Sequence, residues 1–164
     1  MRFLGNIEAK IDSKGRVFLP AAFRKELQSA GEESLVVRKD VFQPCLVLYP
    51  ESVWNRQMDI LRSRLNRWDK RHQSVMRQFV SDAETVTLDA NGRMMLGRRH
   101  LKMAGAAQAV MFIGMDDVIE IWSAELAEEP FMSQEEFGAA LESIMRQNAD
   151  GTAAERAASP GDNK

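Results

Sequence analysis

Two short segments carry the same residues in the same order: Asp-x-x-Gly-Arg occurs at Asp12–Arg16 and again at Asp89–Arg93. An aspartate before a tight turn can accept hydrogen bonds from N–H groups of the turn or brace the guanidinium that follows. A braced arginine presents a planar pair of donors, which matches a phosphate group or the O6/N7 edge of guanine. The segments therefore predict two equivalent turns that point Arg16 and Arg93 at a ligand.

The residues inside the turns fit this prediction. Asn91-Gly92 is a strong hairpin signal because both residues tolerate positive φ, and Lys14-Gly15 is its weaker form. Lys14 also adds a positive charge to the first turn. The alternative is that each Asp–Arg pair only stabilises its own turn. The repetition of the pair favours the ligand-facing interpretation.

Other kinds of chemistry are poorly supported. Asp12 and Asp89 could be imagined as paired catalytic carboxylates, but an adjacent arginine would keep each one ionised and unsuited to acid catalysis. His72 and His100 have no cysteine or second histidine at ligand spacing. Phosphate-loop, dinucleotide and nucleophile-elbow patterns are absent from the sequence. We therefore expect no enzyme, no cofactor, no metal site and no small-molecule substrate, and we expect Cys45 to be a small buried hydrophobe.

The turns belong to a longer repeat, in which residues 7–20 align with residues 84–97 without gaps. In each copy, apolar and polar residues alternate before the turn, as in a half-buried strand, and a second apolar run follows it. A helix opened by Pro20 is predicted after the first copy and one over 98–104 after the second. Each copy then continues with two further strands. One such unit would bury little surface alone, so the two should share a core.

The rest of the chain is predicted to be helical or polar. Apolar residues between Trp54 and Phe79 fall mostly at alternating spacings of four and three, which is typical of an amphipathic helical stripe that also includes Trp68, and Asn66–Asp69 could break it into two helices. We expect an α+β, β-rich fold with a first repeated unit, a helical linker, a second repeated unit, a C-terminal helix and a disordered tail, at 5–52, 53–80, 82–125, 131–147 and 148–164.

Charge and composition limit the environment and the partners. The net charge of −2 conceals a balance of +7 in residues 1–102 and −9 in residues 103–164. This asymmetry suggests a polyanionic partner on one face or subunits that attract each other, with a merely solvated imbalance as the alternative. No apolar run approaches the ~18–20 residues of a membrane span. A single cysteine and an N-terminus without a long apolar stretch indicate a cytoplasmic protein.

Two further segments, Phe3-Leu4-Gly5-Asn6 and Pro44–Pro50, complete a set of motifs that resembles the MraZ family over about residues 1–145. The resemblance implies a bacterial transcriptional regulator in which two AbrB-like swapped-hairpin units form a shared barrel. It implies binding of double-stranded DNA at short direct repeats in the protein's own promoter, within the cell-division and cell-wall gene cluster. It also implies a nucleoid-associated homo-oligomer, arranged as a ring, that acts as a repressor.

The resemblance also implies roles for individual residues. The DNA-binding residues are Arg16, Arg93 and Lys14, and the residues that brace the hairpins are Asp12, Gly15, Asp89, Asn91 and Gly92. Asn91 stands where the first turn has Lys14, so the second turn is expected to grip phosphate less strongly. An alternative from another class is an oligomeric scaffold that binds protein partners, with structural Asp–Arg hairpins. An antitoxin of the same fold is a related alternative, against which the doubled unit argues.

Overall fold

The computed structural model describes the backbone of residues 1–157 and the side chains of residues 1–147. It comprises two compact units, Met1–Ala127 and a second that begins at Glu128. The first unit contains the strands β1 (Asn6–Lys10), β2 (Arg16–Phe18), β3 (Leu35–Lys39), β4 (Leu46–Pro50), β5 (Glu84–Val86), β6 (Arg93–Met95), β7 (Ala109–Met115) and β8 (Val118–Ser123). Its helices are α1 (Ala21–Ser29), α2 (Glu51–Arg64), α3 (Lys70–Ser81), α4 (Arg98–Ala104) and the short 3₁₀ helix η1 (Ala124–Leu126).

The strands of the two sequence repeats interleave. A six-stranded antiparallel sheet has the order β1-β7-β8-β4-β3-β5, and β2 and β6 form a separate antiparallel pair. The strands that flank each turn therefore pair across the repeat: β1 pairs with β7 of the second copy, and β5 pairs with β3 of the first. The fold is α+β with a mostly antiparallel sheet, and the strand pairing joins the two copies.

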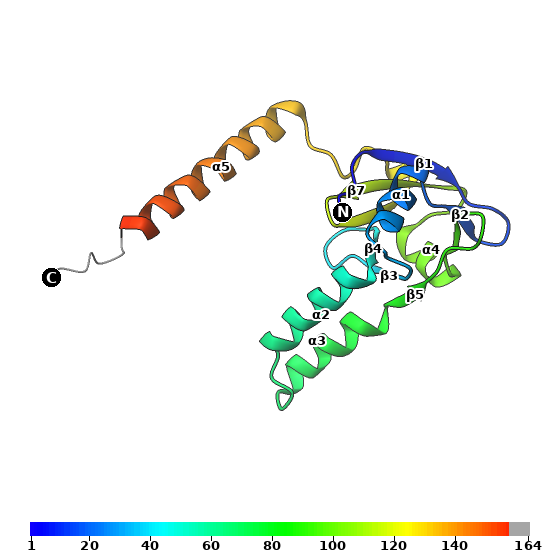
Figure 1. Cartoon of the computed structure of the whole chain (residues 1–164), viewed down its shortest axis with the longest axis horizontal. Coiled ribbons are helices and arrows are strands. Elements are labelled where there is room, and N and C mark those ends of the chain that lie inside the picture. The colour runs from blue at the N-terminus through cyan, green and yellow to red at the C-terminus, as the bar shows by residue number, and fades with distance from the viewer. Residues whose placement is uncertain (158–164) are drawn as a thin grey trace. The chain divides into compact units, whose positions relative to one another are not determined.

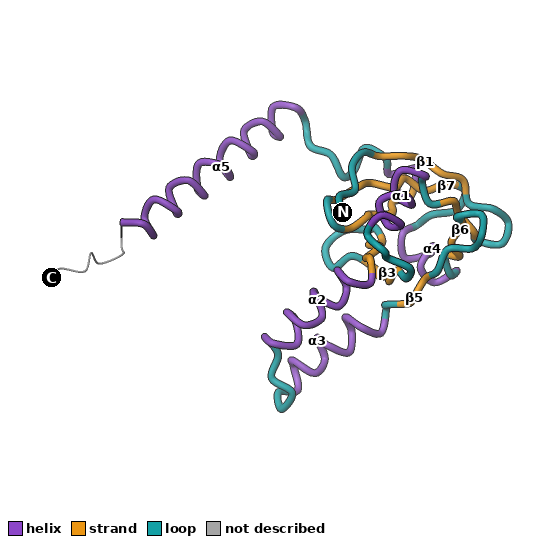
Figure 2. Tube along the Cα trace, viewed as in Figure 1, coloured by secondary structure: helices purple, strands orange, loops and turns teal. Residues whose placement is uncertain are grey.

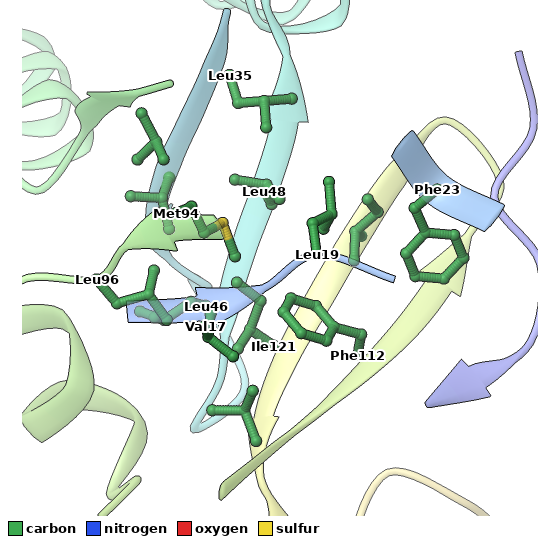
Figure 3. Packing of buried hydrophobic residues seen from close by; sticks show 14 of the residues in the cluster. Val17, Leu19, Phe23, Leu35, Leu46, Leu48, Met94, Leu96, Phe112 and Ile121 are labelled. Carbon is green, nitrogen blue, oxygen red and sulfur yellow. The ribbon is translucent and has the colours of Figure 1, made fainter. Parts of the chain in front are cut away.

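Both copies also contribute to one hydrophobic core. Val17 of β2 lies opposite Met94 of β6, and each is only 1% exposed. Figure 3 shows their side chains among others from both repeats, including Leu19, Phe23, Leu35, Leu46, Leu48, Leu96, Phe112 and Ile121. Burying a side chain of this size contributes roughly 1.5–3 kcal/mol. Because side chains alternate along a strand, the inward placement of Val17 and Met94 turns Arg16 and Arg93 to the opposite face.

The helices that follow β2 and β6 confirm the predictions made from the repeat. α1 starts directly after Pro20 and buries Phe23 and Leu27. α4 covers the predicted range 98–104, and His100 occupies the position that aligns with Phe23. His100 is 4% exposed, and its Nε2 lies 2.7 Å from the backbone oxygen of Asp82. A hydrogen bond to the backbone therefore lets a polar ring fill an apolar position.

The linker forms the two helices α2 and α3, which lie side by side and extend away from the sheets (Figure 1). The predicted break is confirmed: a loop separates the helices, drawn in teal in Figure 2, and the Asp69 side chain caps α3. Trp54 of α2 stacks on Phe79 of α3, with ring centroids 5.6 Å apart. Buried Arg38 of β3 lies over the Phe79 ring, 4.2 Å from its centroid. The stripe prediction is wrong for Trp68, which lies in the loop and is 94% exposed.

The second unit contains helix α5 (Gln134–Ala157). Its backbone is helical past residue 147, where the sequence predicted the helix to end and a disordered tail to begin. The rest of that tail, residues 158–164, lies outside the described residues. In the part of the chain that the structure describes, no helix combines the length and apolarity needed to cross a membrane.

Candidate functional site

The first Asp-x-x-Gly-Arg segment forms a tight turn whose hydrogen bonds centre on Asp12. Its backbone N–H donates to the backbone oxygen of Arg16 at 2.9 Å, and the N–H of Gly15 donates to the oxygen of Asp12 at 3.0 Å. The Oδ1 atom accepts from the N–H groups of Lys14 and Arg16, at 2.9 and 2.8 Å. Oδ2 accepts from Nε of Arg16 at 2.7 Å. One carboxylate thus fixes both the turn and the guanidinium.

The second segment repeats this arrangement atom for atom. Oδ1 of Asp89 accepts from the N–H groups of Asn91 and Arg93, both at 2.9 Å. Oδ2 accepts from Nε of Arg93, also at 2.9 Å. Gly92 has φ +84° and Gly15 has φ +79°, a left-handed backbone conformation that residues other than glycine rarely adopt. The predicted equivalence of the two turns is therefore confirmed in their geometry.

The environment of both aspartates favours their ionised form. The pKa of Asp12 is lowered from its ordinary 3.8, first by the hydrogen bond from the N–H of Arg16, and the bond from its guanidinium acts in the same direction. The pKa of Asp89 is lowered in the same way, first by the N–H of Arg93. Both groups are therefore carboxylates near neutral pH, which suits them to hold an arginine and not to donate a proton.

The pairing of β2 with β6 brings the two arginines to one place. Arg16 lies opposite Met95 in the ladder, and Arg93 lies opposite Phe18. The Arg93 guanidinium is 5.7 Å from the centroid of the Phe18 ring. Both arginines line one hollow of about 200 Å³, together with Asp89 and with Thr87, Leu88, Met94 and Met95. The sequence predicted two equivalent turns that point Arg16 and Arg93 at a ligand, and in the structure both arginines line the same hollow.

The arginines are held but not fully enclosed. The Arg16 side chain is 29% exposed and the Arg93 side chain 24%. Among the residues whose side chains the structure describes, the hydrogen bonds of both guanidiniums are made by Nε alone. Two Nη atoms on each arginine thus remain for an acceptor outside the protein. A pair of parallel N–H donors suits the oxygens of a phosphate or the O6 and N7 atoms of guanine.

The remaining predicted residues distinguish the two turns. Lys14 is exposed in the first turn, and exposed, neutral Asn91 takes its place in the second. Arg24 of α1 is a residue near the second turn that the sequence repeat did not predict. Its Nη1 donates to the backbone oxygen of Asn91 at 3.4 Å. The alignment pairs Arg24 with Leu101, so the repeat has no matching charge that could have marked it.

Three side chains of types that can bind metal ions form another cluster. Potential ligand atoms of Asp40, Cys45 and Glu120 all lie within 4.8 Å of one another. Their present partners argue against metal binding. Asp40 accepts hydrogen bonds from two backbone N–H groups, and Glu120 accepts from the Trp122 indole at 3.0 Å. Burial raises the pKa of the Cys45 thiol to about 12, so it is protonated near neutral pH. The prediction that Cys45 is a small buried hydrophobe is confirmed, because the residue has 0% exposure.

Comparisons with known proteins agree with the repeat and its motifs. The family model described as "MraZ protein, putative antitoxin-like" matches residues 2–77 and 79–140, which together cover most of the chain. The chain belongs to the MraZ family. The family resemblance predicted from the sequence motifs is thereby confirmed.

Curated relatives carry the same family name. A protein of Phocaeicola vulgatus named transcriptional regulator MraZ is 62% identical over 148 residues, which are 90% of this chain and 96% of the relative. A protein of the same name from Bacteroides thetaiotaomicron is 61% identical over 145 residues, which are 88% of this chain and 93% of the relative. One from Christiangramia forsetii is 31% identical over 146 residues, which are 88% and 94% of the two chains.

Proposed function

We propose that this protein is a sequence-specific DNA-binding transcriptional regulator, which contacts double-stranded DNA through Arg16 and Arg93. The observation that carries the proposal is the hollow lined by residues of β2, β6 and the segment 87–89, where both arginines are fixed through Nε and keep their Nη atoms for an external acceptor. The names of the curated relatives support the same class of function.

The geometry supports different roles for the two arginines and for Lys14 in DNA binding. A guanidinium fixed at Nε loses little conformational freedom when its remaining donors bind, so it can make a directional pair with a guanine edge. A good pair of this kind discriminates against a wrong base by ~1–3 kcal/mol. The ammonium group of Lys14 is a flexible point charge and suits a phosphate. Specificity would thus come from Arg16 and Arg93, and salt-dependent affinity from the surrounding cations.

The finer parts of the proposal concern architecture and assembly. The exchange of strand partners between the repeats supports two AbrB-like swapped-hairpin units in a shared barrel, one in residues 5–52 and one in residues 82–125. Exposed apolar side chains support a homo-oligomer, which we propose is a ring; in α5 they include Phe137, Leu141, Ile144 and Met145. A ring that engages several spaced repeats would gain avidity of ~10²–10⁴ without new contacts.

The target that fits this assembly is a set of short direct repeats in the protein's own promoter, within the cell-division and cell-wall gene cluster. We propose that the ring represses this promoter as a nucleoid-associated protein. Few phosphates are contacted by one pair of turns, so a single repeat should bind weakly. Fragments with one to four repeats should show a steep gain in affinity, and equal affinity for one and for four repeats would contradict the multivalent mechanism.

The proposal is tested by a mobility-shift assay with the DNA upstream of the gene, using the Arg16→Ala, Arg93→Ala variant. A control is Arg2→Ala, Arg146→Ala, because it removes two arginines whose ion pairs, with Asp116 and Glu142, are exposed and lie outside the hollow. We expect the first variant to lose the shift while its oligomeric state, measured by light scattering, stays that of the wild type. The control should bind like the wild type.

Retention of the shift by the Arg16→Ala, Arg93→Ala variant would refute the proposal. It would favour the scaffold alternative, in which the Asp–Arg turns are structural and the oligomer binds protein partners. Loss of the shift together with dissociation of the oligomer would also count against direct DNA contact by these arginines.

A further inference from the structure

The two turns are equivalent in backbone geometry but differ in charge at one position. Lys14 gives the first turn a cation between its aspartate and its arginine, and Asn91 leaves the same position of the second turn neutral. Two turns that approach the same kind of polyanion would therefore bind it unequally, unless another residue compensates.

A cation from the other repeat lies against the second turn. Arg24 projects from α1, and its Nη1 is 3.4 Å from the backbone oxygen of Asn91. The guanidinium also covers Gly92, because a methyl group at Gly92 would overlap Nη1 of Arg24 and would lie 2.7 Å from Cζ. The charge of Arg24 thus lies at the tip of the second turn, beside the residue that replaces lysine.

The first turn has an apolar residue in the corresponding place. Leu101 of α4 aligns with Arg24 in the repeat, and its Cδ1 would be 3.8 Å from a Cβ added to Gly15. The two turns therefore differ at two positions: the first has Lys14 in the turn and a leucine beside Gly15, and the second has Asn91 in the turn and an arginine beside Gly92. Each turn therefore has one further cation beside its Asp-bound arginine: Lys14 at the first turn and Arg24 at the second.

Arg24 is poorly satisfied by the protein itself. Its Nε is buried, and in the described part of the chain no acceptor hydrogen-bonds to it. The bond from Nη1 to Asn91 is long for a hydrogen bond. A purely structural role would be served better by an apolar side chain such as that of Leu101, since an unmade buried hydrogen bond destabilises the fold.

We propose that Arg24 is a third arginine of the DNA-binding surface, which contacts a phosphate at the second turn and replaces the lysine that this turn lacks. This proposal rests on the proposed function. It implies that the DNA contact region at the second turn is built from both repeats, with Asn91 and Arg93 from one and Arg24 from the other.

The test measures affinity for the DNA upstream of the gene across a range of salt concentrations. Arg24→Leu copies the residue of the other repeat, and Arg24→Leu, Asn91→Lys returns the lost charge from within the turn. The matched control Lys25→Leu removes the adjacent, exposed cation of α1. For each subunit bound to DNA, we expect Arg24→Leu to weaken binding about tenfold and to reduce the slope of log affinity against log salt by ~0.9. The double variant should recover both quantities, and Lys25→Leu should match the wild type.

Thermal unfolding separates this role from a structural one. Arg24→Leu should unfold at the wild-type temperature or above it, because it removes a buried donor without a partner. Wild-type affinity for Arg24→Leu, an equal loss for Lys25→Leu, or failure of Asn91→Lys to restore the salt slope would each overturn the inference. If the Arg16→Ala, Arg93→Ala variant, measured in parallel, also binds like the wild type, the proposed function fails too; if it loses binding, only the role of Arg24 fails.

Discussion

The left-handed glycines of the two turns should differ in their tolerance of a methyl group. Gly15 and Gly92 have φ +79° and +84°. Gly31, after α1, has φ +70°, and apart from its chain neighbours no atom of the described residues lies within 4 Å of a Cβ added there. Alanine in this conformation costs ~1–2 kcal/mol, offset by ~0.4–1 kcal/mol because alanine restricts the unfolded chain. Gly31→Ala should therefore reduce the free energy of unfolding by about 1 kcal/mol and measure the backbone term alone.

The neighbours of each turn then set the difference. A Cβ at Gly15 would lie 3.0 Å from the backbone oxygen of Leu96, whose N–H bonds back to Gly15 at 3.0 Å. Leu96 lies between β6 and α4, where its backbone is held by this hydrogen bond, so relief of the contact should add about 1 kcal/mol. Apart from chain neighbours, the three described atoms nearest to a Cβ at Gly92 all belong to the flexible side chain of Arg24, which can move aside. We expect losses of about 2 kcal/mol for Gly15→Ala and about 1 kcal/mol for Gly92→Ala.

Urea unfolding followed by circular dichroism measures all three variants, and equal m-values would show that the unfolded states are comparable. We expect Gly15→Ala to have the lowest free energy of unfolding of the three variants. The values for Gly92→Ala and Gly31→Ala should be close to each other. A larger loss of unfolding free energy for Gly92→Ala than for Gly15→Ala would refute this explanation. In the explanation, the Arg24 side chain can move away from an added methyl group and the Leu96 backbone cannot.

Three further predictions concern the thiol, the linker anchor and the paired carboxylates. Because burial raises the pKa of Cys45 to about 12, native protein at pH 8 should react with a thiol reagent far more slowly than urea-unfolded protein, and equal rates would contradict its burial. Arg38→Ala should reduce the free energy of unfolding by about 2–4 kcal/mol in urea unfolding, because Arg38 is 4% exposed and its Nε donates to the backbone oxygen of Phe79 at 3.1 Å; a loss below about 1 kcal/mol would contradict this anchor. The pKa values of Asp12 and Asp89 are lowered in the folded state, so the stability they confer is present above their ordinary 3.8 and is lost as the pH falls through the folded value. The gap in unfolding free energy between wild type and Asp12→Asn, Asp89→Asn should accordingly stay constant from about pH 5 to pH 8 and close in acid, and a gap that changes near neutrality would point to other groups.

Features set by neighbouring residues could be predicted from the sequence. The Asp12 and Asp89 turns depend on contacts within five residues, so their motif was enough to anticipate the bracing of the arginines. The break before α3 could be predicted for the same reason, since Asp69 caps the N–H groups directly after it.

Features that depend on distant partners could not be predicted from local patterns. The alternation in β2 shows that Val17 faces the core, but nothing local specifies that Met94 is its partner or that the two arginines share one hollow. Trp68 fits the helical spacing of the stripe, yet the loop between α2 and α3 places it in solvent. Arg24 looks like an ordinary helix residue until α1 is packed against the second turn.

The central claim, that Arg16 and Arg93 read DNA as forked donors held by aspartate, is tested most directly by replacing both with lysine. Lysine keeps the charge but cannot bind Asp12 or Asp89 through one nitrogen while it presents two others. The affinity of Arg16→Lys, Arg93→Lys should be measured for the upstream DNA and for unrelated DNA of equal length. We predict that binding to unrelated DNA persists while the preference for the upstream DNA falls at least tenfold. An unchanged preference would contradict the claim that these guanidiniums recognise the sequence.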